Sequence, residues 1–135
     1  SIGSSNALIR SGDNFVAYCF AEIEGYSKFG KYIGNGSTDG TFVYTGFRPA
    51  FVIYKRTNST GNWGMLDSTR STFNVTDDWM ASNLSNSETA ESNRDADFLS
   101  NGFKLDGTNN DTNASGSTYI YMAFAENPFK YANAR

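Results

Sequence analysis

The chain has 135 residues and a net charge of -3, and it is 39% hydrophobic, 16% aromatic and 19% charged, which suits one globular domain with its own core. It has no basic run for phosphate contacts and no apolar stretch long enough to cross a bilayer, so we expect neither a nucleic-acid partner nor insertion into a membrane. The absence of histidine excludes Ser-His-Asp catalysis, Cys-His catalysis and His-ligated zinc.

Alternating hydrophobicity predicts a series of short strands. The first, residues 14–22 (NFVAYCFAE), and the last, residues 118–126 (TYIYMAFAE), have the clearest pattern. Between them we expect strands, in chain order, at 30–34, 41–45, 49–56, 62–67, 79–84 and 97–105. Asn101-Gly102 predicts a two-residue hairpin turn or a bulge within the last of these. Residues 82–96 are expected to form an irregular loop.

The segment PAFVIYKR at 49–56 is apolar on both faces, which predicts a central strand covered above and below. Short strands separated by linkers rich in Gly, Asn, Ser and Thr indicate an all-β fold, an antiparallel β-sandwich of the jelly-roll or lectin-like type. We expect one sandwich module at 14–127, an N-terminal arm or linker at 1–13 and a C-terminal tail at 128–135. The expected core consists of Val16, Tyr18, Phe20, Phe51, Val52, Ile53, Ile120, Met122 and Phe124, with the lone Cys19 buried in a strand.

One strand-like segment occurs twice in the sequence: FVAYCFAE at 15–22 resembles YIYMAFAE at 119–126. Strands use few residue types, so a chance match is one interpretation. In the other, the first copy is the closing strand of a preceding unit. Left open, this strand would expose an apolar edge, which proteins rarely allow. We therefore expect it to pair within its own sheet or with a neighbouring chain, and its assembly residues are Phe15, Val16, Tyr18 and Phe20.

The chain resembles a family of tandem modules in tailed-bacteriophage proteins, mostly from marine and cyanobacterial phages. Units of that family run from GF-P-FV-KR, through a W-D-R segment and a late SNGF-L, to a closing strand ending in F-A. Here the corresponding segments are GFRPAFVIYKR, NWGMLDSTR, SNGFKL and YIYMAFA, and the resemblance covers about residues 12 to 132. The family's modules often follow laminin-G or concanavalin-like lectin domains. The chain departs from the tandem pattern in carrying one complete unit, and its first residue, Ser1, indicates a processed or excised piece.

The resemblance implies a non-enzymatic structural module of a virion, in a tail fibre or host-attachment structure, with host surface glycans as its candidate ligand. Two alternatives stay open: a capsid-decorating or head-fibre scaffolding protein without a ligand, and a polysaccharide-degrading enzyme. The resemblance also implies location in the extracellular phage particle and other virion proteins as partners. It further implies a homo-oligomer, with a trimer favoured. We expect no cofactor.

Aromatic and polar residues in the middle of the chain could form a sugar platform. Carbohydrate sites combine an aromatic face with carboxylate, amide and guanidinium groups, and the candidates are Trp63, Asp67, Arg70 and Trp79. A core tryptophan beside a structural Asp67–Arg70 ion pair fits the same residues.

The loop DGTNNDTN supplies oxygen ligands of the kind that calcium prefers, and the candidate metal residues are Asp106, Asn109 and Asp111. Asn110 and Asn113 add amide oxygens, although the distal glutamate of EF-hand loops is missing. An ordinary polar turn is the alternative.

A glycosidase would need two facing carboxylates, and the candidates are Glu22, Glu24, Glu126, Asp77 and Asp78. Their spacing marks no two of them as a pair.

Overall fold

The computed structural model describes residues 12–90 and 92–128, which contain nine β-strands. In chain order they are β1 (Ser27–Ile33), β2 (Phe42–Tyr44), β3 (Pro49–Arg56), β4 (Trp63–Asp67), β5 (Asp78–Ala81), β6 (Thr89–Ala90), β7 (Ala96–Leu99), β8 (Gly102–Leu105) and β9 (Thr118–Ala125). Among the described residues there is no helix long and apolar enough to cross a membrane. Most of the predicted arm at 1–13 and of the tail at 128–135 lies outside the described residues.

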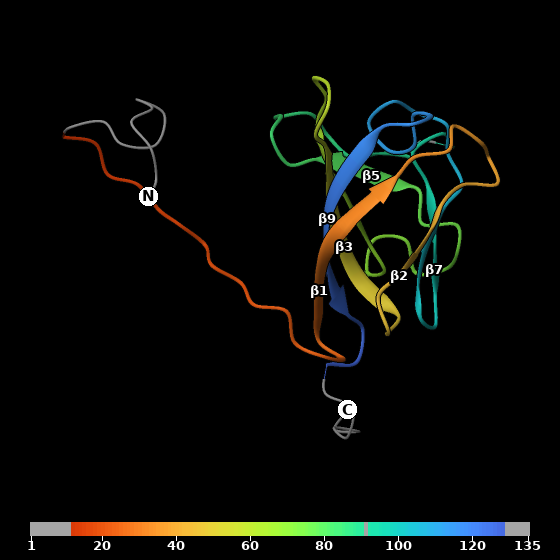
Figure 1. Cartoon of the computed structure of the whole chain (residues 1–135), viewed down its shortest axis with the longest axis horizontal. Helices are drawn as coiled ribbons and strands as arrows, with labels where there is room; N and C mark the ends of the chain where they lie inside the picture. The colour runs from red at the N-terminus through yellow and green to blue at the C-terminus, as the bar shows by residue number, and fades with distance from the viewer. Residues whose placement is uncertain (1–11, 91, 129–135) are drawn as a thin grey trace.

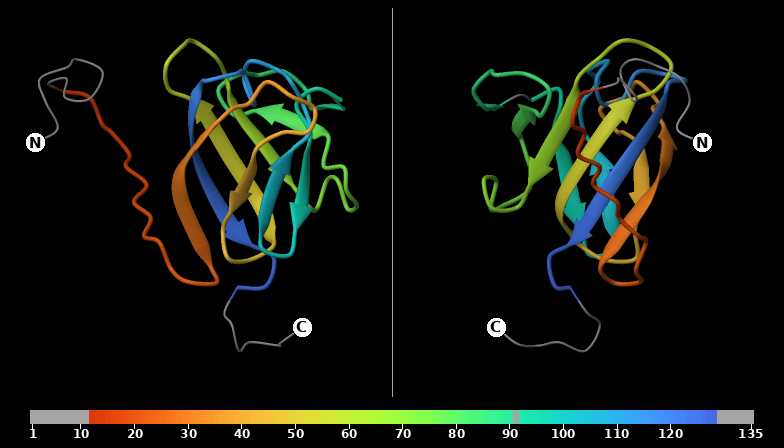
Figure 2. Two further views of the ribbon diagram at one scale, coloured as in Figure 1. Left: turned by 45° about the vertical axis from the view of Figure 1, so that its right-hand side comes forward. Right: turned by 90° about the vertical axis from the view of Figure 1, so that its left-hand side faces the viewer.

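The strands form two antiparallel sheets that face each other (Figures 1 and 2). One sheet has six strands in the order β1-β9-β3-β4-β5-β6, and the other has three in the order β2-β8-β7. The prediction of an all-β antiparallel sandwich is confirmed. The smaller sheet covers only one face of the larger one, here called the inner face. The opposite face of the six-stranded sheet is called the outer face.

The core lies between the two sheets and is aromatic. Tyr32 stacks on Tyr119 with 4.9 Å between ring centroids, and Phe103 packs edge-on against Tyr121 at 5.5 Å. Tyr54 is fully buried, and its hydroxyl accepts a hydrogen bond of 2.9 Å from the indole N–H of Trp79. The other buried apolar members are Val43, Phe47, Val52, Leu66, Ala81, Ala96, Phe98, Leu105 and Ala123.

For the main strands, most of the residues predicted to be core lie on the face opposite to the one that is buried. Val52 is buried as predicted, but Phe51, Ile53, Met122 and Phe124 are half-buried and lie on the outer face. Ile120 lies there too and is 41% exposed. The inner face of β9 is instead built from Tyr119, Tyr121 and Ala123. Both faces of β9 are apolar, so the sequence pattern did not distinguish them.

The segment 12–22, which we call the arm, is an extended chain outside both sheets, so the prediction of a strand at 14–22 is wrong. Its large side chains are exposed rather than buried: Phe15, Val16, Tyr18 and Phe20. Cys19 is also exposed, which corrects its predicted burial. In Figure 1 the arm runs away from the sandwich, and the right-hand view of Figure 2 shows it passing in front of β9 and β3.

Candidate functional site

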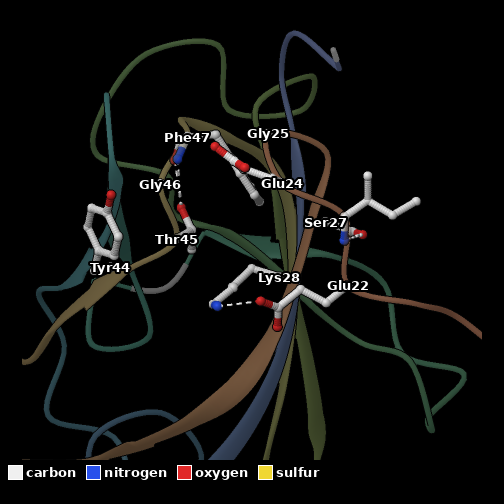
Figure 3. Close-up of a pocket in the computed structure, with 10 residues that line it drawn as sticks. Glu22, Glu24, Gly25, Ser27, Lys28, Tyr44, Thr45, Gly46 and Phe47 are labelled. Atoms are coloured by element: carbon white, nitrogen blue, oxygen red, sulfur yellow. Dashed lines mark hydrogen bonds and ion pairs between the residues drawn. The ribbon is translucent and has the colours of Figure 1, made fainter. Parts of the chain in front are cut away.

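A polar pocket of about 380 Å³ lies at one end of the sandwich, between the edge strands β1 and β2 (Figure 3). One wall is the turn that leads from the arm into β1, and the other is the connection from β2 to β3. The lining residues are Glu22, Ile23, Glu24, Gly25, Ser27, Lys28, Tyr44, Thr45, Gly46 and Phe47.

An ion pair holds the first wall in place. The Lys28 ammonium lies 2.5 Å from a carboxylate oxygen of Glu22, and this hydrogen bond lowers the pKa of Glu22 and raises that of Lys28. The chain reverses beside it: Ser27 N–H donates to the carbonyl of Ile23 at 2.9 Å, and the Ser27 hydroxyl donates to the carbonyl of Ala21 at 2.8 Å. These contacts fix the direction in which the arm leaves the sandwich.

The second wall is a tight turn. Gly46 has a φ of +86°, a conformation that side chains other than glycine rarely adopt. The Thr45 hydroxyl donates to the carbonyl of Phe47 at 2.6 Å. Tyr44 closes the end of β2 with its ring 64% exposed. The pocket therefore offers an exposed ring, a carboxylate and an ammonium, which can stack on and hydrogen-bond a polyhydroxylated ligand.

The predicted sugar platform is divided between the two faces of the large sheet. Trp63 is half-buried on the outer face, whereas Trp79 is 6% exposed in the core with the Arg94 guanidinium 4.1 Å above its ring. Trp79 is therefore a core tryptophan and offers no exposed ring to a sugar. Trp63 and Asp67 stand at opposite ends of β4, so the structure does not bring them into one site.

The structure does join Asp67 and Arg70, as the structural alternative expected. Arg70 Nε lies 2.5 Å from Asp67 Oδ2, and Arg70 Nη1 reaches Glu88 at 2.9 Å. Asp67 Oδ1 also accepts the backbone N–H groups of Thr69 and Arg70. Burial opposes ionisation of Asp67, but the hydrogen bonds from Arg70 outweigh it and lower the pKa of that carboxyl. Asp67 and Arg70 thus close the turn after β4.

Two of the three residues predicted to bind calcium, Asp111 and Asn109, have side-chain oxygens that already accept hydrogen bonds from the protein, whereas Oδ2 of Asp106 is buried without a hydrogen-bond partner. Asp111 accepts hydrogen bonds from the backbone and the amide of Asn62, and Asn109 Oδ1 accepts from the backbone N–H of Asp111. Asp106 lies 3.7 Å from Lys104, and burial followed by the charge of Asp97 raises its pKa. No cluster of three or more acidic, histidine or cysteine side chains that could hold a metal occurs at 12–90 or 92–128.

The candidate carboxylates fall into separate places. Glu22 and Glu24 line the pocket, and Glu126 pairs with Arg48 at 3.0 Å. Asp77 and Asp78 both accept hydrogen bonds from the Ser71 hydroxyl at the start of β5. Strands β9, β3 and β4 lie between β5 and β1 in the large sheet. The structure brings Asp77 and Asp78 to neither Glu22 nor Glu126.

Sequence reasoning missed the pocket and misread the outer face. The pocket joins residues 22–28 to residues 44–47, and no motif links the two segments. The outer face carries Phe29, Phe51, Ile53, Met65, Ile120, Met122 and Phe124. The signal for it was present in PAFVIYKR, which is apolar on both sides.

Comparison with known proteins places the chain in a family. No curated protein matches the chain, and no solved structure matches it. Residues 1–128 match the family described as "Domain of unknown function (DUF7483)", a match that takes in both the arm and the sandwich. The chain belongs to this DUF7483 family.

Proposed function

We propose that the chain is a non-enzymatic structural module of a bacteriophage virion, part of a tail fibre or host-attachment structure. The segments that carry its resemblance to phage modules form strands and turns of the sandwich. GFRPAFVIYKR is the turn at Gly46 and the central strand β3, SNGFKL is the turn between β7 and β8 followed by β8, and YIYMAFA lies in β9. Motifs that build the fold, rather than a reaction centre, are what a structural module needs.

The duplicated strand is the observation that carries this proposal. One copy, β9, lies inside the large sheet between β1 and β3. The other copy, the arm, precedes the sandwich and stands outside it. A second copy of the closing-strand sequence just before a complete sandwich is what two successive units of a modular fibre leave at their joint. In such a fibre the module assembles with other virion proteins and with copies of itself, with a trimer as the favoured state.

Particle composition tests the virion assignment. Phage particles from the source of this chain are purified on a density gradient, and their proteins are quantified by mass spectrometry. The chain should copurify with the particles at a constant ratio to the major capsid protein. Its presence in the infected lysate but not in the particles would overturn the proposal.

The pocket between β1 and β2 supports host surface glycans as the ligand of this module. Its exposed Tyr44 ring lies across from the Glu22–Lys28 ion pair, which can donate and accept hydrogen bonds with sugar hydroxyls (Figure 3). On a glycan array, binding should be lost in Tyr44→Ala and Lys28→Ala. It should persist in Phe73→Ala, which removes a ring that is 83% exposed on another loop.

Two results would contradict these assignments separately. A chain that binds no glycan on the array, yet copurifies with particles, would be a scaffolding module without a ligand. Release of reducing ends from host polysaccharide by the purified chain, abolished by Glu22→Gln or Glu24→Gln, would show an enzyme instead.

A further inference from the structure

The outer face of the six-stranded sheet is unusually apolar for a surface that no second layer of the described chain covers. Antiparallel sheets with one solvated face normally alternate apolar residues inside with polar residues outside. Here β3 presents Phe51 and Ile53 outward, and β9 presents Met122 and Phe124 beside them. These side chains are half-buried, and the rings of Phe51 and Phe124 lie 6.2 Å apart. An apolar patch of this kind on a folded domain marks a contact surface.

The arm has the complementary property of exposing large apolar side chains along most of its length. Tyr18 is 82% exposed and Val16 is 79% exposed. In a β-strand alternate residues point the same way, so an arm that packs in strand conformation presents Val16 and Tyr18 on the side of Phe20. By the sequence repeat, Val16, Tyr18 and Phe20 correspond to Ile120, Met122 and Phe124, and all three of those lie on the outer face.

Phe20 shows that this side of the arm fits the outer face. Its ring lies 5.7 Å from that of Phe124, edge to face, and 6.3 Å from that of Phe29. On the N-terminal side of Phe20 the arm turns away from the large sheet of its own chain. Its direction is set by the hydrogen bonds of Ser27 to Ile23 and Ala21. Figure 2 shows the result, an arm that stands off in front of the outer face.

We propose that the arm of one copy of this chain packs on the outer face of a second copy, with Val16 and Tyr18 against the ring and sulfur groups of that face. Residues 12–19 in extended form reach roughly 26 Å, enough to cross several strands about 4.8 Å apart. If two copies exchange arms with each other, the assembly closes as a dimer. If each copy passes its arm to the next around a ring of three, it closes as a trimer. The inference concerns the purified chain alone, so it does not depend on the proposed virion role.

Association of the full chain tests the proposal, with sedimentation and light scattering measured over a wide concentration range. Tyr18→Asp changes the arm and Ile120→Lys changes the most exposed outer-face position. Each should weaken association by about tenfold or more. Phe73→Asp, which changes an equally exposed ring elsewhere, should leave it unaltered. A chain that stays monomeric, or an oligomer that neither variant weakens, would overturn the proposal.

Cross-linking distinguishes a second copy's arm from the chain's own arm folded down. Cys19 is the only cysteine in the sequence, and Lys31 is an exposed residue on the outer side of β1. A tagged chain with Cys19 is mixed with a chain carrying Cys19→Ser and Lys31→Cys, and a short bismaleimide is added. The expected product joins the two different chains and disappears with Tyr18→Asp. In a chain carrying both cysteines, an internal link that persists on dilution would show the arm on its own face and contradict the proposal.

Discussion

Asn113 is the residue that holds the long loop between β8 and β9 to the rest of the fold. It is fully buried, its side-chain oxygen accepts the backbone N–H of Asn35, and its amide nitrogen donates to the carbonyls of Ser37 and Gly107. In Asn113→Asp a carboxylate oxygen would face those carbonyls, which should cost about 3 kcal/mol of unfolding free energy. Urea unfolding measures this loss. The exposed neighbour Asn110, changed to Asp, should alter stability by less than about 0.5 kcal/mol. Equal effects of the two changes would contradict the structure.

Asp106 and Asp39 lie on either side of Lys104 and should respond to pH in opposite ways. Burial, then Asp97, raises the pKa of Asp106 above its usual 3.8, so ionisation destabilises the folded state. Asp106→Asn should therefore stabilise the protein at neutral pH, and this gain should shrink as the pH falls through the raised pKa and vanish below 3.8. The hydrogen bond from Lys104 lowers the pKa of Asp39. Asp39→Asn should thus destabilise at neutral pH, with the effect lost as the pH falls below 3.8. Urea unfolding at a series of pH values checks both signs, and parallel profiles would refute them.

At the scale of the strands, β4 depends on a position without a side chain. A Cβ at Gly64 would lie 2.6 Å from the indole nitrogen of Trp79 and from the ring of Tyr54, which are themselves hydrogen-bonded. Gly64→Ala should therefore cost about 1–3 kcal/mol and change the fluorescence of the core tryptophan. Gly116, which has open space around it but a φ of +70°, provides the comparison. Gly116→Ala should cost about 1 kcal/mol from backbone strain alone and leave the tryptophan emission unchanged. Normal packing in Gly64→Ala, judged by stability and emission, would contradict this account of β4.

The positions of strands bounded by turn residues could be predicted from the sequence. Which face of each strand is buried could not. The expected strand at 49–56 coincides with β3, and Asn101-Gly102 marks the turn between β7 and β8. The face of β9 was misassigned because both of its sides are apolar, so alternation gives no phase. The arm repeats the apolar pattern of β9 and its Phe-Ala-Glu ending but is no strand, because β9 has neighbours on both sides and the arm has none in the described chain. Pairing partners decide strand formation more than composition does.

The candidate site was predictable only where its residues are close in sequence. Asp67 and Arg70 are three residues apart, and the structure pairs them as the spacing allowed. Trp79 was a candidate for the sugar platform, yet the alternation of β5 turns it into the core. The pocket of Tyr44 and the Glu22–Lys28 pair depends on two edge strands of different sheets meeting at one end. Sequence periodicity carries no information about such a contact.

For the whole molecule, association through the arm and the outer face couples folding to protein concentration. Anything that binds the folded state alone stabilises it by mass action, so each tenfold rise in concentration should add about 1.4 kcal/mol per association step. For an assembly of this size that corresponds to a rise of roughly 2 to 5 °C in melting temperature. We expect this rise for the native chain in thermal unfolding followed by circular dichroism. Tyr18→Asp should need about tenfold or more higher concentration to reach the same melting temperature, because Tyr18 is 82% exposed in its own chain and its change acts mainly on the contact between copies. A native chain whose melting temperature does not change with concentration would show that its sandwich is stable alone, with the outer face and the arm both open to water.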